Sequence, residues 1–224
     1  MTTTPQHLGW IVQLAVHRAV RRDVARLSAA LADGRKTPPA AISAYWAETS
    51  TQLHHHHELE DTVIKPLMGE RLGERVQPLL ARNAQEHVAM AAAMDDFDAA
   101  ASATTFEIGA ARDALARLRD AIETHLGHEE ADLLPLIPEA FSLDDVAFFQ
   151  AKSAKTNPPQ AFLPWMLDEA SETDLALFTG RLPAPVREQL ESTWMPRRRA
   201  TVDALVSPGA EHVSGQALAS VNQR

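Results

Sequence analysis

Apolar residues recur at intervals of three and four along four long segments of the chain, which is the periodicity of amphipathic helices. The four expected helices cover residues 5–32, 40–68, 74–101 and 106–137. Pro38–Pro39, Gly69 and Gly73 interrupt the pattern between them. Long helices joined by short connections pack against their neighbours in antiparallel order. The pattern therefore predicts an all-α fold, an up-down-up-down four-helix bundle.

The pattern changes after Pro138, where shorter apolar runs are separated by prolines and by Gly180. This segment carries several large apolar side chains, among them Trp165, Met166 and Trp194. So much apolar surface has to be covered, so we expect these accessory helices to pack on the bundle. The expected parts are the bundle at 1–140, the accessory helices at 141–206 and a polar, disordered tail at 207–224.

Two of the expected helices carry the same short motif. His56 is followed four residues later by Glu60, and His125 is followed four residues later by Glu129. In each helix the residue after the glutamate is a second acid, and a proline stands six residues after the glutamate. A spacing of four places both side chains on one helix face. Each of these helices therefore presents an imidazole and a carboxylate toward the bundle axis.

The other two expected helices each add one inward histidine, His17 and His87. Burying two glutamates in apolar stripes that contain no lysine or arginine is costly unless a cation binds them. Four imidazoles and two carboxylates suit iron, manganese or zinc, whereas magnesium and calcium prefer oxygen donors. The sequence predicts two ions that share bridging carboxylates, most simply two iron ions, with manganese or zinc as alternatives.

Four consecutive histidines at 54–57 make the register ambiguous, because His54–Glu58 and His57–Asp61 have the same spacing as His56–Glu60. We prefer His56–Glu60, since Pro66 and the matching motif in the fourth helix fix that register.

The polar neighbours of the motifs are expected to support the ligands or to face solvent. We expect His54 and His55 at the solvated surface, and His57 and His128 at the surface, beside the ligands or in a proton relay. The extra acids of the two motifs, Asp61 and Glu130, are expected to orient ligands or face solvent, and Glu58, Asp61 and Glu130 are candidate proton donors. No catalytic residue is assigned.

A ferritin-like di-iron bundle is the main alternative metal-binding fold. It requires an acid three residues before a ligating histidine. The residues that stand three before the four predicted ligands are Leu14, Leu53, Ala84 and Ile122. None is acidic, which argues against this alternative.

The chain resembles the hemerythrin-like, HHE-type cation-binding domain over residues 10–138. The resemblance lies in the order of the ligand residues: one histidine, one His-x-x-x-Glu motif, one histidine and a second such motif. The resemblance implies that Glu60 and Glu129 bridge two irons. It also implies that His17 and His56 hold one iron, and that His87 and His125 hold the other.

The chain departs from this family pattern on the third expected helix. Oxygen-carrying hemerythrins have a second histidine four residues away from the first, and here those positions hold Asn83 and Ala91. One iron would therefore lack a protein ligand. Tyr45 shares the phase of His56 but lies about 16 Å away along a helix, too far to bind the same ion.

Composition narrows the function classes. A net charge of −9 argues against a nucleic-acid partner, and the run at 197–199 is expected to be a solvated basic helix face. The chain has no cysteine, which excludes disulfides, thiolate metal sites and iron–sulfur clusters. No signal peptide and no membrane span is recognisable, so we expect no membrane partner and a cytoplasmic location.

Three functional hypotheses remain open. The first is a non-haem di-iron protein that binds or reacts with O₂, peroxide or NO, or an oxidoreductase for another small molecule. The second is a sensor that signals through the C-terminal helices, and the third is metal storage or a structural metal site. If Trp165, Met166 and Trp194 line a tunnel to the metals, an enzyme is favoured; if they form an exposed patch, a partner or homodimer interface is favoured.

Overall fold

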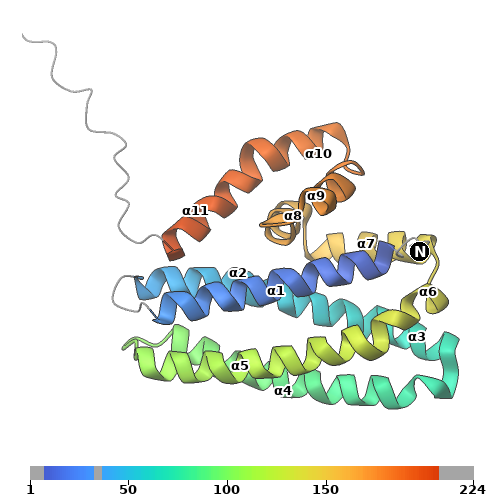
Figure 1. Cartoon of the computed structure of the whole chain (residues 1–224), viewed down its shortest axis with the longest axis horizontal. Helices are drawn as coiled ribbons and strands as arrows, with labels where there is room; N and C mark the ends of the chain where they lie inside the picture. Colours follow the sequence, from blue (N-terminus) through green and yellow to red (C-terminus); the bar gives the residue numbers. More distant parts are fainter. Residues whose placement is uncertain (1–7, 33–36, 207–224) are drawn as a thin grey trace, which may run out of the picture.

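The computed structural model describes residues 8–32 and 37–206, and within these ranges it contains helices and no strand. Four long helices lie side by side (Figure 1): α1 (Leu8–Ala32), α2 (Pro39–Leu59), α4 (Gln77–Ala101) and α5 (Ile108–His128). Helix α1 packs against α2 and α5, and α4 packs against the same two helices. The predicted all-α helical bundle is confirmed.

The core of the bundle contains the inward residues that the periodicity predicts. Fully or almost fully buried are Val20, Val24, Leu27, Leu53, Met94, Phe97, Leu118 and Ile122. A second, smaller apolar cluster includes Met68, Val76 and Phe141 at one end of the bundle. Along the chain, the two motifs at 56–60 and 125–129 stand between residues of the main core, such as Leu53 and Ile122, and residues of the second cluster, such as Met68 and Leu133.

Two of the four helices are interrupted by π-turns that the periodicity did not predict. Helix α2 is followed by a π-turn, η1 (Glu60–Ile64), and then by α3 (Lys65–Leu72). Helix α5 is followed by a second π-turn, η3 (Glu129–Leu133), by the 3₁₀ turn η4 (Leu134–Leu136) and by α6 (Ile137–Ala140). Each π-turn begins at the glutamate of a His-x-x-x-Glu motif. Such turns are frequent at functional sites because the extra residue redirects side chains.

Gly69 does not interrupt the chain as we expected, because α3 continues through it to Leu72. The chain turns at Gly73, and the short 3₁₀ turn η2 (Gly73–Arg75) leads into α4. Gly73 has a φ of 64° and a ψ of −149°. Side chains with a Cβ rarely adopt this conformation.

Replacing Gly73 with alanine should lower the free energy of unfolding by about 1–3 kcal/mol, because the added Cβ strains the backbone. Urea unfolding measures the change. Gly109 is the matched control, since it lies inside α5 and an added Cβ meets nothing within 4 Å. Gly109→Ala should leave the stability unchanged or raise it slightly. Equal effects of the two substitutions would contradict the assignment of strain to Gly73.

The accessory helices follow along the side of the bundle formed by α1 and α2 (Figure 1). They are α7 (Leu143–Thr156), α8 (Pro159–Leu167), α9 (Glu172–Thr179), α10 (Ala184–Gln189), the π-turn η5 (Leu190–Trp194) and α11 (Met195–Val206). A capping box between Ser142 and Asp145 begins α7.

A buried ionic network joins these helices to the bundle. Asp23 of α1 is fully buried and accepts hydrogen bonds from Tyr45 Oη at 2.7 Å and Thr49 Oγ1 at 2.9 Å. It also accepts bonds from Trp165 Nε1 and from Arg198 Nη2, each at 2.8 Å. Arg198 is only 2 % exposed, so the expectation of a solvated basic face at 197–199 is wrong for this residue. Tyr45 belongs to this network.

The start of the first expected helix and the predicted tail at 207–224 lie outside the described residues. Among the residues that are described, no helix is both long enough and apolar enough to cross a membrane.

Candidate metal centre

The six predicted ligands come together inside the bundle, each from a different element. His17 lies on α1, His56 on α2, Glu60 in η1, His87 on α4, His125 on α5 and Glu129 in η3. Their ligand atoms form two adjacent groups in which all atoms lie within 4.8 Å of one another. One group contains His17, His56 and Glu129, and the other contains Glu60, His87, His125 and Glu129. Glu129 belongs to both.

Each glutamate lies between an imidazole of one group and an imidazole of the other. Glu60 Oε1 is 3.3 Å from His56 Nε2, and Glu60 Oε2 is 3.5 Å from His87 Nε2. Glu129 Oε2 is 3.3 Å from His17 Nε2 and 3.6 Å from His125 Nε2. This is the arrangement that two carboxylates need in order to bridge two cations.

The distances and the missing hydrogen bonds both fit ion ligands. The Nε2–O distances of 3.3–3.6 Å are longer than an N–H···O hydrogen bond, which is normally ~2.9 Å long. Several buried atoms also lack a hydrogen-bond partner within the described residues: the Nε2 atoms of His17, His56 and His125, and Oε2 of Glu60 and Glu129. Buried polar atoms are rarely left unpaired. The residues present therefore fit a metal centre.

A fifth histidine, His57, joins the second group. Its ring centroid lies 4.1 Å from that of His87 and 5.4 Å from that of His125, and its Nε2 is buried without a hydrogen-bond partner in the described part of the chain. His57, His87 and His125 form a third ligand group of their own. Sequence reasoning placed His57 among the supporting residues. Its spacing of four from Asp61 was the only signal that singled it out.

Two side-chain amides donate hydrogen bonds to the two glutamates. Gln13 Nε2 donates to Glu60 Oε1 at 2.7 Å, and Asn83 Nδ2 donates to Glu129 Oε1 at 2.6 Å. Asn83 occupies one of the positions where the family pattern has a histidine. Here it donates to a carboxylate, and the imidazole of His57 on the neighbouring helix α2 lies beside His87.

Three further acids contact the outward nitrogens of the ligand histidines. Glu130 Oε1 lies 3.0 Å from His17 Nδ1, and Asp61 Oδ2 lies 3.0 Å from His87 Nδ1. Glu86 Oε2 is 3.6 Å from His125 Nδ1 and its other oxygen bonds His128. Such contacts fix the orientation of the imidazole rings, with the Nε2 atoms turned toward the two glutamates. Asp61 and Glu130, which were expected to orient ligands or face solvent, each contact one of the predicted ligand histidines.

Lys65 was missed by the sequence analysis. Its Nζ donates to Asp61 Oδ1 at 2.9 Å and lies 3.6 Å from Glu60 Oε2 and 3.1 Å from His87 Nε2. Our premise that no basic residue reaches the two glutamates is therefore wrong. The cause is the π-turn, because in such a turn the residue five positions after Glu60 completes the turn. The ammonium group of Lys65 offsets part of the negative charge of Glu60 and Asp61. It forms no described ion pair with Glu129.

Burial and neighbouring charges set different protonation states for the histidines. Burial alone would lower the pKa of His17, but its contacts with Glu129 and Glu130 outweigh that effect and raise it to about 9. Burial lowers the pKa of His56 to about 4 and that of His57 well below its ordinary value. Neutral imidazoles are the form that binds metal ions, so His56 and His57 are ready to do so.

The other two histidines of the run at 54–57 have different surroundings. His54 is exposed and contacts the Ser50 carbonyl of its own helix, as expected of a surface residue. His55 is only partly exposed and lines a cavity, so the expectation of a solvated surface position is wrong for it.

A family model described as the hemerythrin HHE cation binding domain matches residues 12–137. The matched range contains all four long helices of the bundle almost completely, with both π-turns. No curated protein and no solved structure matches the chain. The chain belongs to the family of hemerythrin HHE cation-binding domains.

Proposed function

We propose that this chain binds two iron ions through the groups described above and uses them to bind or react with O₂, peroxide or NO. The converging donor atoms that lack hydrogen-bond partners are the observation that carries the proposal. Imidazole and carboxylate donors suit iron, and a cation-binding function is common to the family. When bound, ferrous ions supply the electrons for such reactions.

The protein ligands are distributed unevenly between the two positions. His17 and His56 serve the first position, and His57, His87 and His125 serve the second. Glu129 belongs to a ligand group at each position, and Glu60 lies between His56 and His87. The first position therefore has one imidazole fewer. A position with fewer protein ligands is the one at which a small molecule can bind, as in open catalytic metal sites.

Two acids connect the ligand histidines to the solvent. Asp61 is 47 % exposed and contacts His87, and Glu130 is 29 % exposed and contacts both His17 and Arg21. Contacts with His17 and Arg21 lower the pKa of Glu130 to about 2. Burial would raise the pKa of Asp61, but its contacts with His87 and Lys65 outweigh that effect and lower it. Both acids are therefore carboxylates that hold their imidazoles in place.

The accessory helices favour a small-molecule reaction over signalling to a partner. Trp165 and Met166 are buried and line a cavity that reaches His56. Trp194 is not among the residues that line it. The alternatives for these three residues were a tunnel to the metals and an exposed patch. Trp165 and Met166 favour the first alternative, because they line a cavity beside a predicted ligand.

His57 should be needed for the second ion. We expect His57→Ala to reduce the iron content from about two ions per chain toward one, because the second position loses one of its three imidazoles. His54→Ala is the control, since His54 is exposed on the same helix and should leave the iron content unchanged. Elemental analysis of both variants after iron loading measures the effect. Unchanged iron content in His57→Ala would remove this residue from the ligand set.

The redox proposal requires a separate test. The iron-loaded chain is mixed with peroxide under anaerobic conditions, and its absorption spectrum and peroxide consumption are followed. We expect charge-transfer absorption to change with peroxide and the change to disappear in His56→Ala. A chain that holds iron but leaves peroxide, O₂ and NO untouched would be a storage or structural metal protein, and the redox proposal would be wrong.

A further inference from the structure

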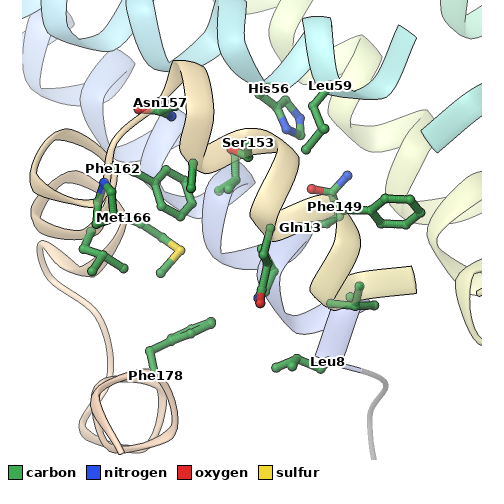
Figure 2. A pocket seen from close by; sticks show the side chains of 18 of the residues that line it. Leu8, Gln13, His56, Leu59, Phe149, Ser153, Asn157, Phe162, Met166 and Phe178 are labelled. Atoms are coloured by element: carbon green, nitrogen blue, oxygen red, sulfur yellow. The ribbon is translucent and has the colours of Figure 1, made fainter. Parts of the chain in front are cut away.

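A cavity of about 400 Å³ lies between the bundle and the accessory helices. Its walls come from α1 and α2 on one side and from α7, α8 and the segment around α9 on the other. Figure 2 shows Phe162, Met166 and Phe178 of the accessory helices across the cavity from Leu8 and Gln13 of α1. Protein interiors are normally close-packed, and cavities of this size are typical of small-molecule sites. The space is therefore a candidate binding site.

The cavity wall is largely apolar. Its buried members include Val16, Val146, Phe149, Trp165, Met166 and Phe178. Among the described residues that line the cavity, Arg181 is the only one of the types Lys, Arg, Asp and Glu. Arg181 is exposed, and its Nη1 donates to the Leu177 carbonyl. A charged molecule would lose its hydration in this cavity without a buried counter-charge, so the wall favours a neutral, apolar one.

The cavity contains one buried side-chain amide whose oxygen has no hydrogen-bond donor in the described part of the chain. Asn157 is 5 % exposed, lines the cavity and donates from Nδ2 to Gln52 Oε1 at 2.7 Å. Its Oδ1 is buried and has no hydrogen-bond partner among the described residues. A buried acceptor without a donor is unfavourable, and a ligand that brings a hydroxyl group would satisfy it.

The cavity reaches His56, one of the residues proposed to hold the first ion. His56 lines it, as Figure 2 shows, and its Nε2 belongs to the ligand group with His17 and Glu129. Gln13 lines it as well and donates a hydrogen bond to Glu60. A molecule in the cavity would therefore contact one metal ligand and the amide that orients a bridging carboxylate. This is also the position with fewer protein ligands.

We propose that this cavity binds a neutral, mostly apolar organic molecule that carries one hydroxyl group, an alcohol or a phenol, with its hydroxyl donating to Asn157 Oδ1. The binding itself needs no metal, whereas a role for this molecule as a substrate rests on the proposed function. The cavity thereby defines the chemical class that reaches the metal centre from the side of the accessory helices.

The first test compares 2-naphthol with naphthalene, which has the same rings and no hydroxyl group. Fluorescence titration of the full chain, free of metal, should show one bound molecule per chain for both. We expect 2-naphthol to bind about threefold to tenfold more tightly, the range that one net hydrogen bond provides. Equal affinities would overturn the role of Asn157. Binding of neither molecule would overturn the proposal.

Variants locate the bound molecule. Ser153 points into the cavity (Figure 2), so Ser153→Phe should fill it and weaken binding of both molecules at least tenfold. Ala151→Phe on the same helix is the control, because Ala151 is exposed and does not line the cavity. Asn157→Leu should abolish the preference for 2-naphthol and leave naphthalene binding unchanged. If that variant does not fold, the comparison of the two molecules on the wild-type chain still decides whether the cavity prefers a hydroxyl group.

Metal loading separates this inference from the proposed function. In the iron-loaded chain, bound 2-naphthol should change the absorption of the metal centre, and Ser153→Phe should remove the change. If the chain binds 2-naphthol but no iron, the cavity stands and the proposed function fails. If binding appears only together with self-association in light scattering, the cavity is an interface between two copies and the proposal is wrong.

Discussion

Glu129→Gln should reduce the iron content of the chain from about two ions to fewer than one. Glu129 belongs to both of the ligand groups that the six predicted residues form, so a neutral amide in its place weakens both positions. The amide keeps the shape of the side chain, and Asn83 can still donate to its carbonyl oxygen. The loss should therefore come from ligation and not from unfolding.

Two measurements separate these causes. Elemental analysis after iron loading gives the metal content, and thermal unfolding without metal gives the stability. The metal-free variant should remain folded, because Asn83 can still donate to the amide and His17 keeps its contact with Glu130. Glu123→Gln is the control, since Glu123 is half exposed on α5 and forms an ion pair with Arg21. Full iron content in Glu129→Gln would contradict the bridging role.

Asp23→Ala should lower the free energy of unfolding by about 3–5 kcal/mol, the usual cost of removing one partner from a buried ion pair. Asp23 is fully buried, and its loss leaves the guanidinium of Arg198 without its nearest buried carboxylate. It also leaves the Tyr45 and Trp165 donors unsatisfied. Because Trp165 and Arg198 belong to the accessory segment, these helices should lose their attachment to α1.

Urea unfolding of the metal-free protein measures this effect. Asp96→Ala is the matched control, since Asp96 forms an ion pair with Arg117 in which both side chains are 59 % exposed. Exposed pairs contribute at most about 1 kcal/mol. A loss in Asp23→Ala as small as that of the control would show that the network does not hold the accessory helices on the bundle.

The sequence predicts the bundle well because its evidence is periodic. The apolar stripe of each long helix, the two motifs and the single histidines on α1 and α4 all depend on positions along a regular helix. The same regularity explains what was missed. A π-turn adds one residue to a turn, so it changes which later side chains share a face. That is how Lys65 comes to lie beside Glu60, where a regular helix would have directed it elsewhere.

His57 and Arg198 were missed for a different reason, since their roles depend on tertiary contacts. In a run of four histidines, the sequence alone shows no difference between a ligand and its neighbour. His57 becomes a candidate ligand only because the rings of His87 and His125 lie next to it. Arg198 stands in a run of three arginines that resembles a solvated face. It is buried because Asp23 and Asp168 accept its hydrogen bonds.

The most direct test of the metal centre is anomalous diffraction at the iron absorption edge from crystals of the iron-loaded chain. We predict two peaks inside the bundle, with Glu60 and Glu129 between them. One peak should lie next to Nε2 of His17 and His56, and the other next to the imidazoles of His57, His87 and His125. A single peak, or peaks away from these residues, would contradict the assignment of a shared, two-ion centre.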